Sequence, residues 1–142
     1  MTTVTNGKVE YINPAGLHRN PAFSNVVMVM GPVKTVYIGG QNAVNGKGEI
    51  VGQGDIARQT EQALTNLRIA LEAGGAKPEH IIKWQIYIVQ GQSLQQAFET
   101  FQRVWSRQPN PPTITVLFVA GLAHPDFLVE IDAVAVVPEL DY

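Results

Sequence analysis

Apolar and polar residues alternate along this chain in several short stretches, and apolar residues recur at helical spacing in two longer ones. The short stretches are rich in β-branched and aromatic residues, and they predict six strands, at residues 8–12, 26–30, 35–39, 82–89, 114–119 and 128–137. A helix is predicted over residues 55–73, with Asp55 as its N-cap and Gly74 at its end. A second helix is predicted from Ser93, whose hydroxyl can cap it, to a stop at Pro109.

The order of these elements is three strands, a helix, a strand, a helix and two strands, which is typical of an α+β protein. We expect one domain, residues 1–142, with a mixed six-stranded sheet and both helices on one of its faces. The other face carries apolar residues such as Val134 and has no cover from this chain, so we expect other copies to cover it. Charged residues make up only 15% of the chain, against about 25% in typical soluble domains. This agrees with a covered surface, and a modestly charged monomer is the alternative.

The last predicted strand carries two carboxylates on one of its faces. Val129, Ile131 and the alternate residues after them form an apolar face, whereas Glu130 and Asp132 lie among apolar residues on the opposite face. Burying an unpaired carboxylate is costly unless the group stays protonated, so Glu130 needs hydrogen-bond partners or a ligand. The strand therefore suggests a small-molecule pocket.

Composition argues against several classes of function. The net charge of −2, with ten scattered basic residues, argues against a large nucleic-acid interface. The chain has no cysteine, and His18, His80 and His124 lack ligand spacing, so neither a metal site nor thiol chemistry is expected. No P-loop or dinucleotide-binding motif is present, and no cofactor is expected. The first residues do not resemble a signal peptide and no apolar run could span a membrane, so we expect a cytoplasmic protein without membrane contact.

Several motifs, in a fixed order, connect this chain to a known family. They are Val36–Gln41, Asp55–Leu67, Pro112–Thr115 and Val129–Ile131. In this order they resemble the RidA family, also called YjgF or L-PSP. The resemblance implies a chorismate-mutase-like α+β protomer that forms a homotrimer, with ligand clefts between neighbouring subunits. It also implies hydrolysis of reactive enamines and imines, in which an arginine binds the substrate carboxylate and a glutamate helps to place the attacking water.

Most of the ligand positions implied by the resemblance are altered in this chain. The glutamate falls at Glu130, the best preserved position. The others are a Ser-Gly-Gln turn that falls at Gly39, Gly40 and Gln41, a tyrosine at Phe23, an asparagine at Phe98, and the arginine at Ile114 or, with a slip of one, Thr113.

Ile114 decides the expected chemistry. A guanidinium contributes two charge-assisted hydrogen bonds to a carboxylate, worth about 1.5–3 kcal/mol each, and isoleucine contributes none. Carboxylate substrates should therefore bind weakly at this position unless Arg107 or Arg19 supplies the cation, although both also fit ordinary surface arginines. Glu130 can serve as a general base or ligand contact, or as a structural acceptor at a subunit interface. Gln41 can likewise orient a ligand or satisfy its own loop.

Three functions remain open from the sequence. The first is a trimer that binds a small metabolite between subunits, with hydrolytic activity that uses Glu130 but without typical enamine or imine deamination. The second is a trimeric binding or regulatory module without catalysis. The third, an L-PSP-type endoribonuclease, needs converging histidines beside cationic phosphate contacts, a pattern that His18 and His124 do not fulfil.

Overall fold

The computed structural model describes residues 6–106 and 108–140. Its elements, in chain order, are β1 (Lys8–Ile12), β2 (Val26–Met30), β3 (Val33–Gln41), α1 (Ile56–Ala73), the 3₁₀ turn η1 (Pro78–His80), β4 (Ile81–Val89), α2 (Leu94–Trp105), β5 (Thr113–Val119) and β6 (Val129–Pro138). The predicted α+β architecture with six strands and two helices is confirmed. Both predicted N-caps are also present, because Asp55 Oδ1 accepts from the Arg58 amide at 3.1 Å and Ser93 Oγ from the Gln96 amide at 3.2 Å.

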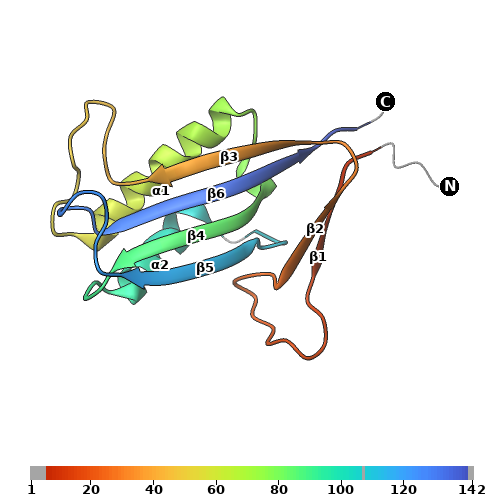
Figure 1. Cartoon of the computed structure of the whole chain (residues 1–142), viewed down its shortest axis with the longest axis horizontal. Coiled ribbons are helices and arrows are strands. Elements are labelled where there is room, and N and C mark those ends of the chain that lie inside the picture. Colours follow the sequence, from red (N-terminus) through yellow and green to blue (C-terminus); the bar gives the residue numbers. More distant parts are fainter. Residues whose placement is uncertain (1–5, 107, 141–142) are drawn as a thin grey trace.

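The strands divide into two sheets rather than forming one sheet of six. A four-stranded mixed sheet has the order β3-β6-β4-β5, in which β6 runs antiparallel to both neighbours and β4 runs parallel to β5. Strands β1 and β2 form a separate antiparallel hairpin that extends away from this sheet (Figure 1). The chain changes direction between β2 and β3 at Gly31, whose φ of 76° suits glycine, and Pro32, which has no amide hydrogen to continue a ladder.

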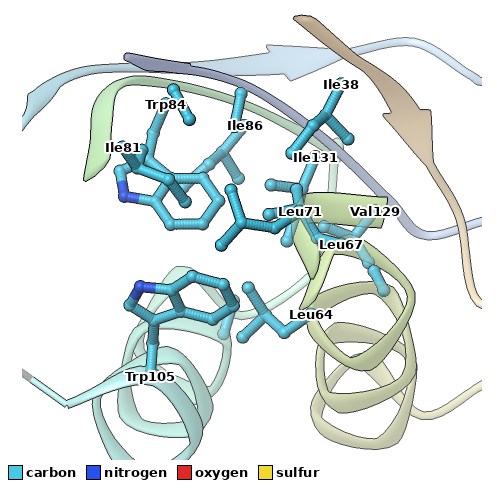
Figure 2. Close-up of a cluster of buried hydrophobic side chains, with 14 of the residues drawn as sticks. Ile38, Leu64, Leu67, Leu71, Ile81, Trp84, Ile86, Trp105, Val129 and Ile131 are labelled. Carbon is cyan, nitrogen blue, oxygen red and sulfur yellow. The ribbon is translucent and has the colours of Figure 1, made fainter. Parts of the chain in front are cut away.

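Both helices pack on the same face of the four-stranded sheet, as predicted (Figure 1). Trp84 of β4 is only 2% exposed, and its ring makes edge contacts with Phe101 and Trp105 of α2, each with a centroid separation of 5.0 Å. The Arg68 guanidinium of α1 lies 4.9 Å from the centroid of the Trp105 ring and joins the two helices. Figure 2 shows this core, which also contains Leu64, Leu67, Leu71, Val129 and Ile131.

The other face of the four-stranded sheet carries no helix (Figure 1). Tyr37 of β3 is 80% exposed there, and Leu117 of β5 is 48% exposed. The side chains of Glu130 and Asp132 project from β6 between these edges, because they alternate with the buried Val129 and Ile131. We call this surface the open face. Within the described residues, no helix is long and apolar enough to cross a membrane.

Candidate functional site

Glu130 lies on the open face, near the end of β3. It stands opposite Tyr87 of β4 in the antiparallel pairing of β6 with β4. On its other side, the pairing of β3 with β6 shifts register between Ile38 and Gln41, a bulge that contains Gly40. A methyl group on Gly40 would lie 2.6 Å from Glu130 Oε2 and 2.7 Å from its Cδ. Glycine at this position is therefore what allows the carboxylate to lie against the backbone of β3.

A chain of amide side chains holds the loop that contacts Glu130. Asn42 Nδ2 donates to Glu130 Oε1 at 3.3 Å and to the Val129 carbonyl at 3.1 Å. Asn66 of α1 donates to the Asn42 carbonyl at 3.0 Å and to the Val44 carbonyl at 2.7 Å. The helix thus positions the Asn42 loop, and the loop provides the hydrogen-bond partner that the sequence requires for Glu130.

Gln59 fixes the beginning of β6 from inside the core. This residue of α1 has an exposed fraction of 0%. Its Nε2 donates to the Gly52 carbonyl at 3.1 Å and the Asp126 carbonyl at 2.9 Å, while its Oε1 accepts from the Leu128 amide at 2.9 Å. The Asp126 carbonyl and the Leu128 amide belong to the half-buried loop that leads into β6, where polar backbone groups need hydrogen-bond partners. Gln59 therefore sets the path of the chain that enters the strand carrying Glu130.

A second carboxylate and a phenol lie beside Glu130 on the open face. Burial raises the pKa of Asp132, and the neighbouring charge of Glu130 raises it further, while Lys83 opposes the rise. Burial also raises the pKa of the Tyr87 phenol, with added contributions from Asp132 and Glu130. The Tyr87 hydroxyl donates to Gln85 Oε1 at 3.1 Å. The region around Glu130 is therefore acidic and partly desolvated.

Phe98 and Ile114 lie on the opposite side of the sheet from Glu130. Both line a cavity of about 70 Å³ between α2 and the start of β5, together with Trp84, Phe101, Trp105, Pro111 and Pro112. Its walls are mostly apolar, because the positions that the family resemblance assigns to asparagine and arginine are occupied here by phenylalanine and isoleucine. In these surroundings Ile114 lies beside apolar and aromatic side chains.

Phe23 lines a separate, open cleft of about 850 Å³ next to that cavity. The cleft lies between the β1–β2 loop and residues 108–111, and Arg19 also lines it. Ser24 anchors the loop, because its amide donates to the Pro112 carbonyl at 3.0 Å and its hydroxyl to the Pro111 carbonyl at 2.5 Å. Arg107, the other candidate cation, lies outside the described residues.

The predicted site residues thus fall into two groups on opposite sides of one sheet. Gly40 and Glu130 are in contact on the open face, whereas Phe23, Phe98 and Ile114 line the cleft and cavity on the other side. A methyl group on Gly39 would meet nothing within 4 Å, and Gln41 Nε2 donates to the Gly39 carbonyl at 3.1 Å, so Gln41 satisfies its own bulge. The grouping itself cannot be seen in the sequence.

Sequence reasoning missed Gln59, Asn42 and Asn66. Gln59 left one signal, an uncharged polar residue within the apolar stripe of the first predicted helix. Asn66 ends a motif used for the family resemblance, but its role depends on the distant Asn42 loop. Within residues 6–106 and 108–140, no group of three or more histidine, aspartate or glutamate side chains could hold a metal ion.

Comparisons with known proteins agree with this geometry. The family model described as Endoribonuclease L-PSP matches residues 18–137. A RutC family protein of Pyrococcus horikoshii is 33% identical over 101 residues, which cover 70% of this chain and 77% of the relative. The crystal structure of YyfB, a Rid-family protein of Yersinia pestis, has a TM-score of 0.78 and 32% identity, covering 89% of this chain and 97% of that one. Escherichia coli TdcF, crystallised with bound serine, has a TM-score of 0.65 and 28% identity, covering 72% of this chain and 80% of its own.

Proposed function

This chain belongs to the endoribonuclease L-PSP family, also called RidA or YjgF, and on that premise we propose that it is a homotrimer that binds a small metabolite between its subunits. The single observation that carries the proposal is the separation of the candidate residues onto two sides of one sheet. One copy does not bring Glu130 together with Phe98 and Ile114, which lie on the helix-covered side of the sheet, and in the proposed trimer a neighbouring copy completes the site beside Glu130. The serine bound in the crystal structure of TdcF supports a small molecule as the ligand class.

The exposed apolar residues of the open face support association of copies. Tyr37 and Leu117 are 80% and 48% exposed in the single chain, and both lie on a sheet face without helix cover. Burying apolar surface of this kind contributes about 25 cal/mol per Å² removed from water. Contact between copies would also exclude water from around Glu130 and Asp132. The lower local dielectric would strengthen the interactions of both carboxylates with any polar group of a ligand.

Glu130 is the group best placed to act on a ligand. Asn42 donates to Oε1 of Glu130, so Oε2, which faces Gly40, is the oxygen that can accept a proton from water or hold a ligand N–H. The apolar wall at Ile114 supplies no partner for an α-carboxylate. We therefore propose a hydrolytic or binding role that differs from typical enamine and imine deamination.

A non-enzymatic trimeric binding module is the second candidate. It is favoured by the same contact between Asn42 and Glu130, because a carboxylate already held by an amide can serve the assembly without activating water. A ribonuclease role has less support, since the net charge of −2 provides no general attraction for RNA.

One variant, Glu130→Gln, separates these candidates. Light scattering of the parent protein should give about three times the chain mass of 15.5 kDa. Turnover should be measured as ammonia release from imino acids generated in situ, beside an arginine-bearing relative as positive control. The exposed Glu49, in the loop after β3, provides the matched control Glu49→Gln, which should change nothing.

The two candidate roles of Glu130 predict different results for Glu130→Gln. If Glu130 serves a ligand, the Gln variant should keep its mass and melting temperature and lose binding or turnover. If Glu130 serves the assembly, the variant should form less trimer, because the new side-chain amide carries N–H donors that would lack acceptors. Each unmatched donor would cost about 1–3 kcal/mol. A stable monomer at micromolar concentration, or a variant unchanged in every respect, would overturn the proposal.

A further inference from the structure

The tripeptide Asn-Gly-Lys occurs twice in this chain, and the fold places its two copies in different surroundings. One copy is residues 6–8, where β1 begins, and the other is residues 45–47, in the loop between β3 and α1. An asparagine before glycine can lose its side-chain ammonia, because the next backbone nitrogen reaches the side-chain carbonyl carbon and glycine has no Cβ to hinder it. Since the reacting residues are identical, the fold decides how the two rates differ.

The second loop directs two backbone N–H groups at the side-chain oxygen of Asn45. Its Oδ1 accepts from the Lys47 amide at 2.9 Å and from the Glu49 amide at 3.1 Å. A backbone N–H can be accepted only by the oxygen of a side-chain amide, so these bonds fix which end of Asn45 is the NH₂ group. Two N–H groups on one carbonyl oxygen are the arrangement that stabilises the negative charge of a tetrahedral intermediate.

The attacking and leaving groups are not held in the same way. Neither the Asn45 NH₂ group nor the Gly46 N–H donates a hydrogen bond to any described residue. Gly46 is exposed, and a methyl group there would meet nothing within 4 Å. The turn is closed by other groups, because the Asn45 amide donates to the Glu49 carbonyl at 2.9 Å and the Gly48 amide to the Asn45 carbonyl at 3.0 Å. The side-chain carbonyl is thus fixed, while the nitrogen that attacks it is accessible.

The first copy has the opposite arrangement at its glycine. The Gly7 amide donates to the Glu139 carbonyl at 2.8 Å, which ties this nitrogen to the segment after β6. A methyl group on Gly7 would lie 3.1 Å from Pro138 Cα, so the backbone is also closely packed there. Attack of this nitrogen on Asn6 requires that the hydrogen bond break and the packed chain move. We therefore expect the fold to protect Asn6.

We propose that Asn45 is a self-modification site, where the folded loop promotes conversion of the asparagine to aspartate and isoaspartate. The Gly46 nitrogen loses its proton to a solvent base and bonds to Asn45 Cγ, while the Lys47 and Glu49 amides stabilise the negative charge on Oδ1. The Cγ–Nδ2 bond then breaks, Nδ2 takes a proton from water, and ammonia leaves a cyclic imide. Water opens either carbonyl of the imide, so no oxidant or reductant is needed. The inference goes beyond the proposed function, because the reaction involves one chain and no ligand.

The products change the loop that contacts Glu130. Each product carries a carboxylate in place of a neutral amide and so adds one negative charge to the net charge of −2. In isoaspartate the main chain is also longer by one atom just after Val44, which disturbs the bridge between Val44 and Ile50. The Val44 carbonyl accepts from Asn66 at 2.7 Å, and Asn66 also holds the Asn42 carbonyl. Isoaspartate should therefore loosen the contact between Asn42 and Glu130.

The test compares both asparagines in the same sample of the full chain. The protein is aged at neutral pH in guanidinium chloride, where it is unfolded, or in sodium chloride of equal concentration, where it is folded. Trypsin cleaves after Lys8 and Lys47, so the two sites fall in separate peptides, and fragmentation mass spectrometry measures deamidation at each site.

Three glycine variants test the role of the loop. Gly48→Ala places a side chain at a φ of 78° and so strains the turn that directs the two amides. Gly16→Ala is the matched control, because it causes the same kind of strain, at a φ of 96°, in a different loop. Gly46→Ala hinders the attacking nitrogen, and since its methyl group has room and its φ is not positive, this variant should fold normally.

In the unfolded chain the two sites should react at rates equal within about two-fold. In the folded protein Asn45 should react at least about ten-fold faster than Asn6, and no more slowly than in the unfolded chain. Gly48→Ala should slow the reaction of Asn45 by about two- to ten-fold, the effect of one lost hydrogen bond, whereas Gly16→Ala should not change it. Gly46→Ala should slow it by about ten-fold or more.

Slower reaction of Asn45 in the folded protein than in the unfolded chain would overturn the proposal. Equal rates at the two sites of the folded protein, or a Gly48→Ala variant that reacts as fast as the parent, would do the same. The effect on the open face is tested by NMR on protein enriched in isoaspartate at position 45. Backbone amide shifts of Asn42 and Glu130 that match those of the fresh protein would overturn the link to Glu130.

Discussion

Replacing Gly40 by alanine tests whether the β3 bulge holds the Glu130 carboxylate. The added methyl group would lie 2.6 Å from Oε2, 2.7 Å from Cδ and 3.0 Å from Cγ of Glu130, so the side chain must move. Moving it off its preferred rotamer costs about 0.5–1.5 kcal/mol. The movement also breaks the 3.3 Å hydrogen bond from Asn42 to Glu130. We assign this bond about 1.5 kcal/mol, the low end of the range for hydrogen bonds to charged groups, because the bond is long.

A smaller effect acts in the opposite direction. Alanine restricts the unfolded chain more than glycine does, which stabilises the folded protein by about 0.4–1 kcal/mol where the backbone is compatible, and Gly40 does not have a positive φ. The net expectation for Gly40→Ala is a loss of about 1–2.6 kcal/mol. For a chain of this size, that loss corresponds to a fall of about 2–10 °C in the melting temperature.

Gly39→Ala is the matched control, because a methyl group there meets nothing within 4 Å and the φ of Gly39 is not positive either. It should be neutral or slightly stabilising. Thermal and urea unfolding of both variants, with light scattering to follow the oligomer, measures the difference. In a Glu130→Ala background the obstacle is gone, so Gly40→Ala should then cost nothing. Equal stabilities of the two glycine variants, or an unchanged cost in the Glu130→Ala background, would refute the coupling.

Two further variants test the surroundings of Glu130. Because the pKa of Asp132 is raised in the folded protein, ionising it costs stability as the pH rises from its ordinary value through the raised one. Asp132→Asn should therefore raise the free energy of unfolding at neutral pH by less than about 1 kcal/mol, because the group is partly exposed, and the melting temperature should rise with it. This gain in stability should vanish below about pH 4, where Asp132 is protonated in the folded and the unfolded protein. A gain that does not depend on pH would contradict the argument. Gln59→Leu removes three hydrogen bonds and takes from the half-buried Asp126 carbonyl and Leu128 amide the partner that Gln59 provides, so chemical unfolding should show a loss of about 3 kcal/mol in the free energy of unfolding. A loss as small as that of Gln62→Leu, which removes one side-chain bond to Asn66, would show that Gln59 does not clamp β6.

Much of the fold followed from local periodicity. The direction of a side chain in a strand depends only on whether its position is odd or even, so the alternation of Val129, Glu130 and Ile131 was enough to place Glu130 on the face away from the core. The helical spacing of apolar residues was likewise enough to predict α1 and the face that it buries. The division of six strands into a four-stranded sheet and a hairpin was not predictable in this way, because the alternation within one strand does not indicate which other strand it pairs with.

By itself, the sequence determined which segments are strands and helices, which face carries Glu130, and that Ile114 cannot bind a carboxylate. Only the tertiary structure decided what surrounds these residues. Asn42 reaches Glu130 across a separation of 88 positions, and that contact depends on the path of a loop held by another helix. The same is true of the cleft at Arg19, which exists because Ser24 joins the hairpin loop to the proline-rich segment. Such contacts arise when the chain packs, and since no local pattern carries them, they appear only in the folded molecule.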